Sequence, residues 1–340
     1  MSVETSDPEA LIPQFVFEQL LNQDSQGRRI ILLGQIASQP ALLLAERAAF
    51  STTPTHLQRF TSSLSSVQNL GDNDIYRWYL ARTSTGSDVA PSDPPPHDLK
   101  LNLIYPCTSK HIRKYTPQTL RYVTETPEIY ARYVRPWIVQ QREEGRLNWV
   151  FNILEGRTEQ EDVLYRSWEH RAPGAGEEEV EKRFILLPDL NWDRKTVSAL
   201  HLLALPERRD KWSVRDLGKG DVAWLEEMVG RLEAAVGELY GGEKGVESDM
   251  IKFYLHYQPT YYHMHIHIVA LTLDAGATQA VGKALDLRNV IGMLKAMPDE
   301  SSSMADVGLS YTVGEGAELW EKIWGPLKKG EKPSVGDGGA

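Results

Sequence analysis

The sequence predicts a two-domain protein in which helices and strands are mixed. Its 340 residues exceed the size at which a single hydrophobic core usually stops growing. With 41% hydrophobic and 25% charged residues, its composition is that of a folded protein. Stretches with strand-like and helical patterns of apolar residues occur in both halves. We expect one domain over residues 1–140, a second over 141–328 and a disordered tail over 329–340.

Strands and helices are both expected in the first domain. Alternating or continuous apolar residues predict strands at 29–37, 74–82 and 99–106, with a proline-rich surface loop at 83–98. The apolar spacing predicts helices at 15–23, 108–125 and 126–141. In the last of these, Thr126 is suited to the N-cap and Pro127 to the first helical position.

The second domain is expected to begin after the charged segment 141–146, with a folded segment at 147–156. The clearest helix runs from Asp221, as N-cap, to about Tyr240, where two glycines follow. A second helix is expected at 279–296, and 194–205 fits a helix or a strand. Residues 169–182 form a charged surface loop. The remaining apolar stretches predict four strands, at 161–167, 183–190, 249–259 and 260–273.

Charge and cysteine content restrict the possible partners and location. A net charge of −10 argues against broad binding to DNA or long RNA, although a locally basic pocket could hold a small anion. The single cysteine, Cys107, cannot form an internal disulfide, which fits a reducing compartment. The acidic start is unlike a secretory signal, and residues 30–50 are too polar to span a bilayer. We expect a soluble intracellular protein with no membrane partner, in the cytoplasm, with the nucleus as an open alternative.

Three histidines alternate in YYHMHIHIVAL, residues 261–271: His263, His265 and His267. In a strand these side chains would share one face, with Met264 and Ile266 on the other. Three interpretations are open. A row of imidazoles can bind zinc, although the nearest carboxylate in sequence is seven residues away. The histidines can be structural, or one can be a nucleophile that attacks phosphorus while its neighbours donate hydrogen bonds.

The His-x-His-x-His pattern followed by apolar residues resembles the histidine triad (HIT) nucleotide hydrolases and transferases. The longer string YLHYQPTYYHMHIH, together with NWVFNILEG, FILLPDLNWD and NLIYP…KHIRKY, is similar to the scavenger mRNA decapping enzymes within that superfamily. The resemblance covers residues 70–300. It implies hydrolysis of the 5′–5′ triphosphate bridge of residual 7-methylguanosine caps, either cap dinucleotide or short capped RNA. The products would be 7-methyl-GMP and a nucleoside diphosphate or diphosphate-ended RNA.

The resemblance also assigns roles in the reaction. His265 would be the nucleophile and form a covalent nucleotidyl-histidine, with no metal or other cofactor. His263 and His267 would orient and polarise the site, and His256 would contact phosphate. Thr260 and Tyr261 correspond to a hydroxyl pair near the phosphates, and Lys283 to a basic phosphate contact near a helix start.

Base recognition follows the same likeness. Trp149 matches the tryptophan that stacks on the methylated base, and a cationic alkylated guanine independently favours an aromatic face. Glu159 matches the acid that reads the guanine edge, with Glu161 as the alternative register. A segment lining base and ribose corresponds to Pro188, Asp189 and Leu190, and the next residue, Asn191, takes the place of a triphosphate contact. Residues brought over the bound cap from the N-terminal half correspond to Asn73, Tyr76 and Lys114.

Two positions depart from the family pattern. Asn191 stands where a lysine usually contacts the triphosphate, so a positive charge facing a polyanion is lost. Lower activity, altered substrate preference or compensation by Lys195 would follow. His201 stands where an aromatic residue is common.

The resemblance further implies an α+β fold. The C-terminal HIT domain would carry an antiparallel sheet with helices, and a smaller N-terminal α/β domain would swap strands in a homodimer. Closure of the N-terminal domains would gate hydrolysis and exclude long RNA. Three alternatives stay open: a HIT hydrolase of other dinucleoside polyphosphates, a weakly active cap-binding regulatory protein, and a zinc enzyme.

Overall fold

The computed structural model describes residues 8–24, 28–48, 50–73, 76–83, 99–170, 179–189 and 192–335. The chain divides into two compact units, residues 1–117 and 118–340. The boundary predicted at 140/141 therefore lies inside the second unit. Residues 118–140 belong there because Val134, Trp137 and Ile138 are buried in its main core. The predicted connection at 141–146 begins at the end of a helix of that unit, and Gln141 is itself buried.

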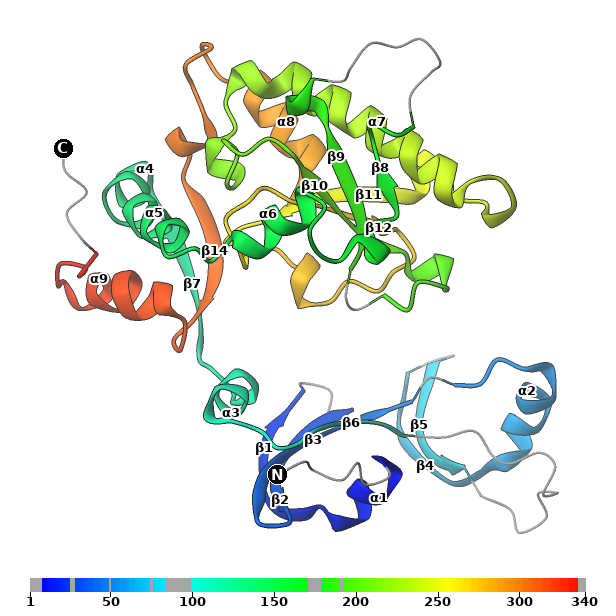
Figure 1. Ribbon diagram of the computed structural model, residues 1–340. Coiled ribbons are helices and arrows are strands. Elements are labelled where there is room, and N and C mark those ends of the chain that lie inside the picture. Colours follow the sequence, from blue (N-terminus) through cyan, green and yellow to red (C-terminus); the bar gives the residue numbers. More distant parts are fainter. Residues whose placement is uncertain are drawn as a thin grey trace. The chain divides into compact units, whose positions relative to one another are not determined.

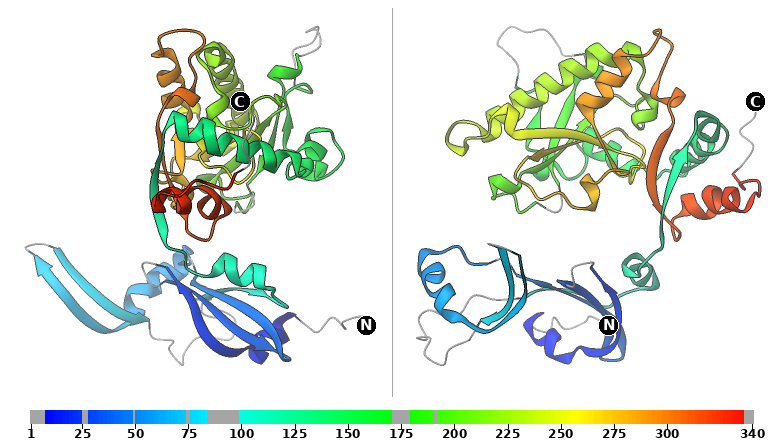
Figure 2. Two further views of the ribbon diagram at one scale, coloured as in Figure 1. Left: turned by 90° about the vertical axis from the view of Figure 1, so that its left-hand side faces the viewer. Right: turned by 180° about the vertical axis from the view of Figure 1, so that it is seen from behind.

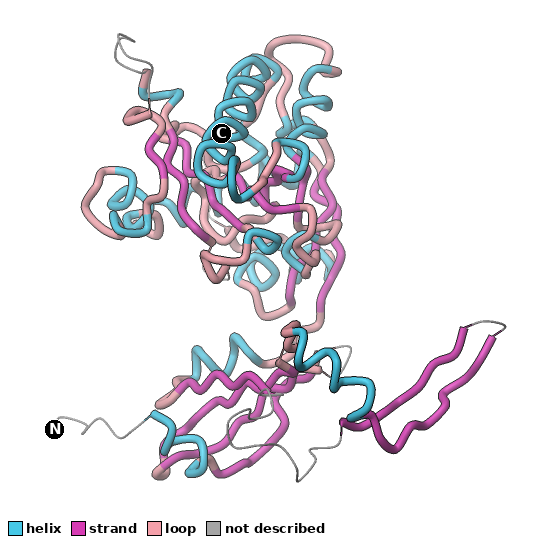
Figure 3. Tube along the Cα trace, turned by 90° about the vertical axis from the view of Figure 1, so that its right-hand side faces the viewer, coloured by secondary structure: helices cyan, strands magenta, loops and turns pink. Residues whose placement is uncertain are grey.

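The first unit contains a four-stranded antiparallel sheet in the order β1-β2-β3-β6, and β4 and β5 form a separate two-stranded ribbon (Figure 3). The strands predicted at 29–37, 74–82 and 99–106 correspond to β2, β5 and β6. The strands are β1 (Val16–Gln23), β2 (Arg29–Ile36), β3 (Gln39–Arg47), β4 (Leu64–Asn73), β5 (Tyr76–Thr83) and β6 (Leu99–Ile104). The helices are α1 (Pro8–Leu11), α2 (Pro54–Phe60) and α3 (Ser109–Tyr115).

Two helix predictions in this region are wrong. The predicted helix 15–23 is instead the strand β1, Val16–Gln23, whose pairing with β2 shifts register between Phe17 and Gln19 and again between Leu20 and Asn22. These irregularities break the two-residue alternation, so the apolar spacing looked helical. The predicted helix 108–125 ends at Tyr115, and its second half is a strand of the other unit, because Pro117 removes a backbone donor and restricts the residue before it.

The second unit is built on a six-stranded antiparallel sheet in the order β13-β11-β12-β10-β9-β8. Helices α7 and α8 lie together on one face of this sheet, and α6 lies on the other (Figures 1 and 2). The strands are β8 (Tyr165–Arg166), β9 (Phe184–Pro188), β10 (His201–Pro206), β11 (Ile251–His256), β12 (Ile266–Ala270) and β13 (Ala284–Asp286). The helices are α6 (Asn148–Leu154), α7 (Val222–Tyr240) and α8 (Leu287–Lys295).

Strand alternation divides the core of this unit between the two faces. Leu186, Leu202 and Ile266 pack with the apolar stripe of α7 in the larger cluster. Ile185 and Leu187 point the other way and pack with α6. Asp221 occupies the predicted N-cap of α7, but its carboxylate accepts hydrogen bonds from Lys211 Nζ and the Gly218 amide instead of capping the helix.

A smaller layer completes the unit. Strand β7 (Leu120–Glu125) pairs with β14 (Leu309–Gly314), and the helical run that follows β7 packs beside them. That run confirms the helix predicted at 126–141, with Thr126 as N-cap. It consists of α4 (Pro127–Ile129), a π-helical turn (Tyr130–Val134) and α5 (Arg135–Glu143). The chain continues from β14 through a second π-helical turn (Trp320–Trp324) into α9 (Gly325–Lys329).

Several predictions in this half change in detail. Residues 260–265 are not part of a strand, since β12 begins at Ile266, and the helix predicted at 279–296 is the strand β13 followed by α8. Residues 194–205 resolve into a short 3-10 turn and the strand β10. The tail predicted to be disordered from 329 includes the buried Val335, and residues 336–340 lie outside the described residues, as do most of the predicted loops 83–98 and 169–182. Among the helices that the structure describes, none combines the length and apolarity needed to span a bilayer.

Candidate active site

The face of the sheet that carries α6 also carries a group of histidines. Phe253 and Leu255 of β11 point into the α7 core, so His256 points to the opposite face. By the same alternation, His267 lies opposite Ile266 and Ile268 on β12. These two strands are hydrogen-bonded neighbours, which brings residues from distant sequence positions onto one surface.

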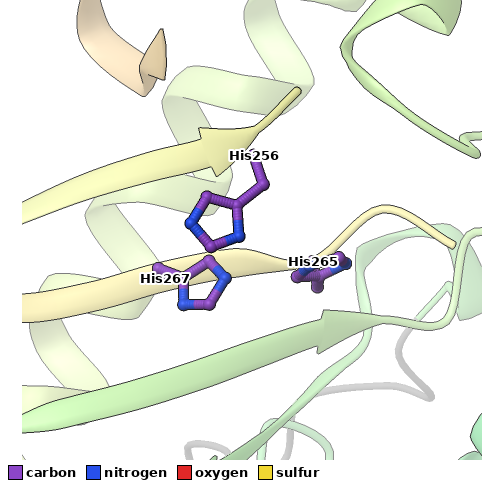
Figure 4. A group of neighbouring side chains, drawn as sticks. All are labelled: His256, His265 and His267. Carbon is purple, nitrogen blue, oxygen red and sulfur yellow. The ribbon is translucent and has the colours of Figure 1, made fainter. Parts of the chain in front are cut away.

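His256, His265 and His267 form a close cluster (Figure 4). The ring centroids of His256 and His267 are 4.2 Å apart, and those of His265 and His267 are 5.3 Å apart. Figure 4 shows His256 reaching from the end of β11 toward His267, with His265 just before β12. Tyr254 stacks on His267 at 4.8 Å and fixes the plane of its ring.

The tautomer of His265 follows from its hydrogen bond. Its Nδ1 lies 2.8 Å from the carbonyl oxygen of His263. A carbonyl only accepts, so Nδ1 carries the proton and Nε2 keeps its lone pair. The ring is clamped against Tyr261, which stacks on it at 4.2 Å. His265 is therefore a fixed imidazole with an unprotonated Nε2, as a nucleophile requires.

His263 does not join this cluster. Its Nε2–H donates to the carbonyl of Pro206 over 2.8 Å, and its ring packs edge-on against Phe151. The prediction that all three alternating histidines line one strand face is wrong, because the chain before Ile266 is not extended as a strand. His263 acts on the site through its backbone, whose carbonyl orients His265. His256, the fourth histidine, occupies the position beside His267 instead.

Burial keeps these imidazoles neutral. It lowers the pKa of His256, His263 and His265 to about 4, with the positive charge of Lys283 adding to the effect at His256 and His265. The pKa of His267 is lowered furthest, first by burial and then by the neighbouring imidazoles. At neutral pH the site therefore offers imidazole lone pairs and N–H donors rather than cations.

The three clustered imidazoles, those of His256, His265 and His267, could also serve as metal ligands. His256, His265 and His267 each offer a nitrogen within 4.8 Å of the others, and Asp189, His201 and His267 form a second such group. Three imidazoles with an open position suit zinc. Geometry alone therefore leaves both a metal site and a metal-free nucleophile open.

A pocket of about 500 Å³ lies in this unit; the clustered histidines are not among its lining residues, but Tyr261, which stacks on His265, is one of them. Trp149 and Tyr261 line it, with ring centroids 4.8 Å apart in an edge-on arrangement. Trp149, on α6, is 44% exposed, so its indole is accessible to a ligand. Thr260 and Lys283 line the same pocket, and Lys283 Nζ donates to the Gln258 carbonyl over 2.6 Å. Four of the predicted binding residues thus line one pocket, and Tyr261 connects that pocket to His265.

Lys283 lies in a turn rather than at a helix start. It is followed directly by β13, and α8 begins only at Leu287. Its side chain is partly buried, and burial lowers its pKa. A buried cation with a carbonyl partner retains two further N–H donors for an anion.

The segment predicted to line base and ribose begins at the end of β9. Pro188 is the last residue of that strand, and Asp189 Oδ2 lies 3.6 Å from His201 Nε2. Glu159 and Glu161 are both exposed, in and next to a short turn after α6, so the choice between them stays open. Leu190 and Asn191 lie outside the described residues, and so the consequence of the missing lysine stays a prediction.

The predicted residues of the first unit are described only as backbone. Asn73 and Tyr76 pair across β4 and β5, and Lys114 lies in α3. Their roles over a bound cap stay predictions.

Sequence reasoning missed the polar cluster behind the pocket. Glu125 and Arg215 form a fully buried ion pair, with Arg215 Nη2 2.6 Å from Glu125 Oε1. The other carboxylate oxygen accepts from Tyr311 and from Gln258, and both of these residues line the pocket. Glu125 was placed inside a predicted helix, so no signal in the sequence joined it to Arg215. Tyr254 could have been found, since it is two residues from His256 on the same strand.

Comparison with known proteins identifies the family. The family model "Scavenger mRNA decapping enzyme (DcpS) N-terminal" matches residues 10–118, and "Scavenger mRNA decapping enzyme C-term binding" matches residues 148–282. The m7GpppX diphosphatase of Schizosaccharomyces pombe is 33% identical over 92% of this chain and 95% of its own length. Those of Ascaris suum and Homo sapiens are 36% and 29% identical, over 84% of this chain each and over 86% and 78% of their own lengths. The chain belongs to the scavenger mRNA decapping enzyme family.

Proposed function

We propose that this protein is an m7GpppX diphosphatase, a hydrolase of the 5′–5′ triphosphate bridge in residual 7-methylguanosine caps. Its substrates are the cap dinucleotide and short capped RNA left after 3′-to-5′ mRNA decay. The products are 7-methyl-GMP and a nucleoside or oligonucleotide diphosphate. The observation that carries the proposal is His265, held neutral with its Nε2 lone pair free and stacked on Tyr261, which lines a pocket with an exposed tryptophan.

The chemistry proceeds in two displacements. His265 Nε2 attacks the phosphorus bonded to 7-methylguanosine, a P–N bond forms, and the P–O bond to the nucleoside diphosphate breaks. The resulting positive charge on the ring is stabilised by the Nδ1–H bond to the His263 carbonyl. Water then attacks the same phosphorus, the P–N bond breaks, and 7-methyl-GMP leaves with His265 neutral again. Lys283 is the cation that meets the developing negative charge, whereas the single proton of neutral His256 lies on Nε2, which donates to the Thr278 carbonyl over 2.8 Å.

Base recognition uses Trp149. Methylation at N7 makes the guanine cationic, and a cation over an indole face is favourable. The exposed indole and the acidic Glu159 or Glu161 support a preference for the methylated base over an unmethylated one. The same histidines would serve other dinucleoside polyphosphates, so base methylation is the variable that separates the two substrate classes.

The proposal extends to assembly and location. The protein acts in the cytoplasm as a homodimer whose N-terminal units exchange strands and close over the sites. Support comes from β1, where Val16, Phe17 and Leu20 are more than half exposed, since such apolar side chains usually need a partner surface. Light scattering of the full chain tests the dimer, and a monomer at micromolar concentration would contradict it.

Product analysis tests the function. The full chain is incubated with methylated cap dinucleotide and, separately, the unmethylated dinucleotide, each in excess chelator. We expect 7-methyl-GMP and nucleoside diphosphate from the methylated substrate, and much slower turnover of the other. Equal turnover of both would favour a general dinucleoside polyphosphate hydrolase, and cap binding without any product would favour a regulatory cap-binding protein. Loss of activity in the chelator would favour a zinc enzyme.

A further inference from the structure

We propose that His201 is a positioning residue: it holds His267 in the tautomer that presents an N–H to the substrate phosphate. The expected effect of His201 on catalysis rests on the proposed function, but the tautomer of His267 can be measured in a protein without activity. His201 is the first residue of β10 and His267 lies on the neighbouring strand β12.

The two imidazoles share one hydrogen bond. His201 Nε2 and His267 Nδ1 are 3.1 Å apart, and both rings are buried. Burial lowers the pKa of both, so at neutral pH each ring carries one proton. One of the two nitrogens must therefore donate and the other must accept. The direction of this bond determines which nitrogen of His267 is protonated.

The surroundings of His201 decide the direction. Asp189 Oδ2 lies 3.6 Å from the same Nε2, which is too long for a hydrogen bond and close enough for a strong electrostatic effect. A carboxylate favours a proton on the nitrogen that faces it. The Tyr254 hydroxyl, 3.5 Å from that nitrogen, can accept as well as donate. His201 Nε2–H therefore donates to His267 Nδ1, and the single proton of His267 is placed on Nε2.

The orientation matters because His267 Nε2 is buried and has no hydrogen-bond partner among the described residues. A buried N–H without a partner is unfavourable, and an acceptor on the substrate would satisfy it. The phosphoryl oxygens gain negative charge during attack by His265, whose ring lies 5.3 Å from that of His267. An N–H at this point stabilises that charge, whereas a lone pair in the opposite tautomer would repel it.

Two substitutions separate this role from a packing role. His201→Leu keeps a buried apolar side chain and removes the donor, while His201→Gln keeps an N–H close to the position of Nε2. We expect His201→Leu to lower kcat about 10- to 100-fold, the loss of one charge-assisted hydrogen bond, with KM within about twofold. His201→Gln should recover most of the loss. The matched control is His170→Gln, which removes an imidazole that pairs with Glu238 far from the cluster and should leave kcat unchanged.

Nitrogen-15 NMR of histidine-labelled protein reads the tautomer directly. We expect His267 to be protonated at Nε2 in the wild type and to shift toward the Nδ1–H form in His201→Leu. Protonation of His267 at Nδ1 in the wild type would overturn the proposal, as would wild-type kcat in His201→Leu or equal defects in the Leu and Gln variants. If the wild type shows no turnover at all, the proposed function fails while the NMR result still tests His201.

Discussion

Glu125→Gln removes the charge from the most deeply buried ion pair that the structure describes in the second unit. The Glu125 and Arg215 side chains are both 0% exposed. Glu125 Oε1 accepts from Arg215 Nη2 at 2.6 Å and Nε at 3.0 Å, and Oε2 accepts from Tyr311 at 2.8 Å and Gln258 at 3.1 Å. A glutamine would leave the guanidinium buried without its counter-charge and would place an amide donor against these donors.

The expected cost is large because the remaining charge cannot reach water. Breaking a buried pair by changing one partner costs about 3–5 kcal/mol, whereas an exposed pair contributes about 0–1 kcal/mol. Glu318→Gln is the matched control, since Glu318 pairs with Arg146 at 3.2 Å and both side chains are about half exposed, 49% and 48%. Denaturant unfolding of the full chain, followed by tryptophan fluorescence, measures both variants.

A double-mutant cycle measures the interaction energy between Glu125 and Arg215 separately from their contacts with other residues. Arg215→Met alone should be as damaging as Glu125→Gln, and the combined variant should be more stable than the sum of the two losses predicts. A loss below about 1 kcal/mol in Glu125→Gln, or strict additivity in the cycle, would refute the reasoning that this pair is stabilised by mutual charge neutralisation.

Three further predictions concern the site. Trp149→Ala should raise KM for the methylated cap about 10- to 100-fold, because about 1–3 kcal/mol of stacking is lost, and Trp149→Phe should raise KM less. Steady-state kinetics measure both variants, and an unchanged KM in Trp149→Ala would show that Trp149 does not bind the base. Lys283→Met should lower kcat/KM for the methylated cap about 10- to 100-fold, because a partly buried cation is lost, whereas Lys283→Arg should retain most of the activity. Wild-type kcat/KM in Lys283→Met would contradict a contact between Lys283 and the phosphates. The free energy of unfolding should fall as the pH is lowered from about 6.5 to about 4. The pKa of His256, His263 and His265 is about 4 in the folded protein and 6.5 in the unfolded chain. The unfolded state therefore binds more protons in this pH range, and protonation favours it. Urea unfolding across this pH range measures the effect, and His263→Asn should reduce its slope.

The pattern of apolar residues predicted an element correctly where that element depends mainly on its own sequence. The helix α7 follows the apolar stripe from Leu225 to Leu239, and β9 follows a continuous apolar run that both faces of the sheet bury. The residues of the pocket wall could also be predicted, since Trp149, Thr260, Tyr261 and Lys283 lie together as expected. Those four residues were predicted from the resemblance of short sequence motifs to a known family, and not from the periodicity of apolar residues.

Long-range pairing could not be predicted. Residues 120–125 become a strand because residues 309–314 are available to pair with them, a contact between segments nearly two hundred residues apart. The histidine row was assigned to one strand face because alternation is a property of strands, but the chain becomes a strand only at Ile266. His263 therefore turns toward Pro206 and His256 takes the place beside His267.

Direct detection of the covalent intermediate tests the central claim. The wild-type protein is mixed with methylated cap dinucleotide in chelator, quenched in denaturant within one turnover, digested and analysed by mass spectrometry. The account predicts a 7-methylguanylyl group on the peptide containing His265, formed and lost at rates that match turnover, and neither adduct nor product in His265→Asn. Turnover by His265→Asn at the wild-type rate, or an adduct on a different side chain, would contradict it.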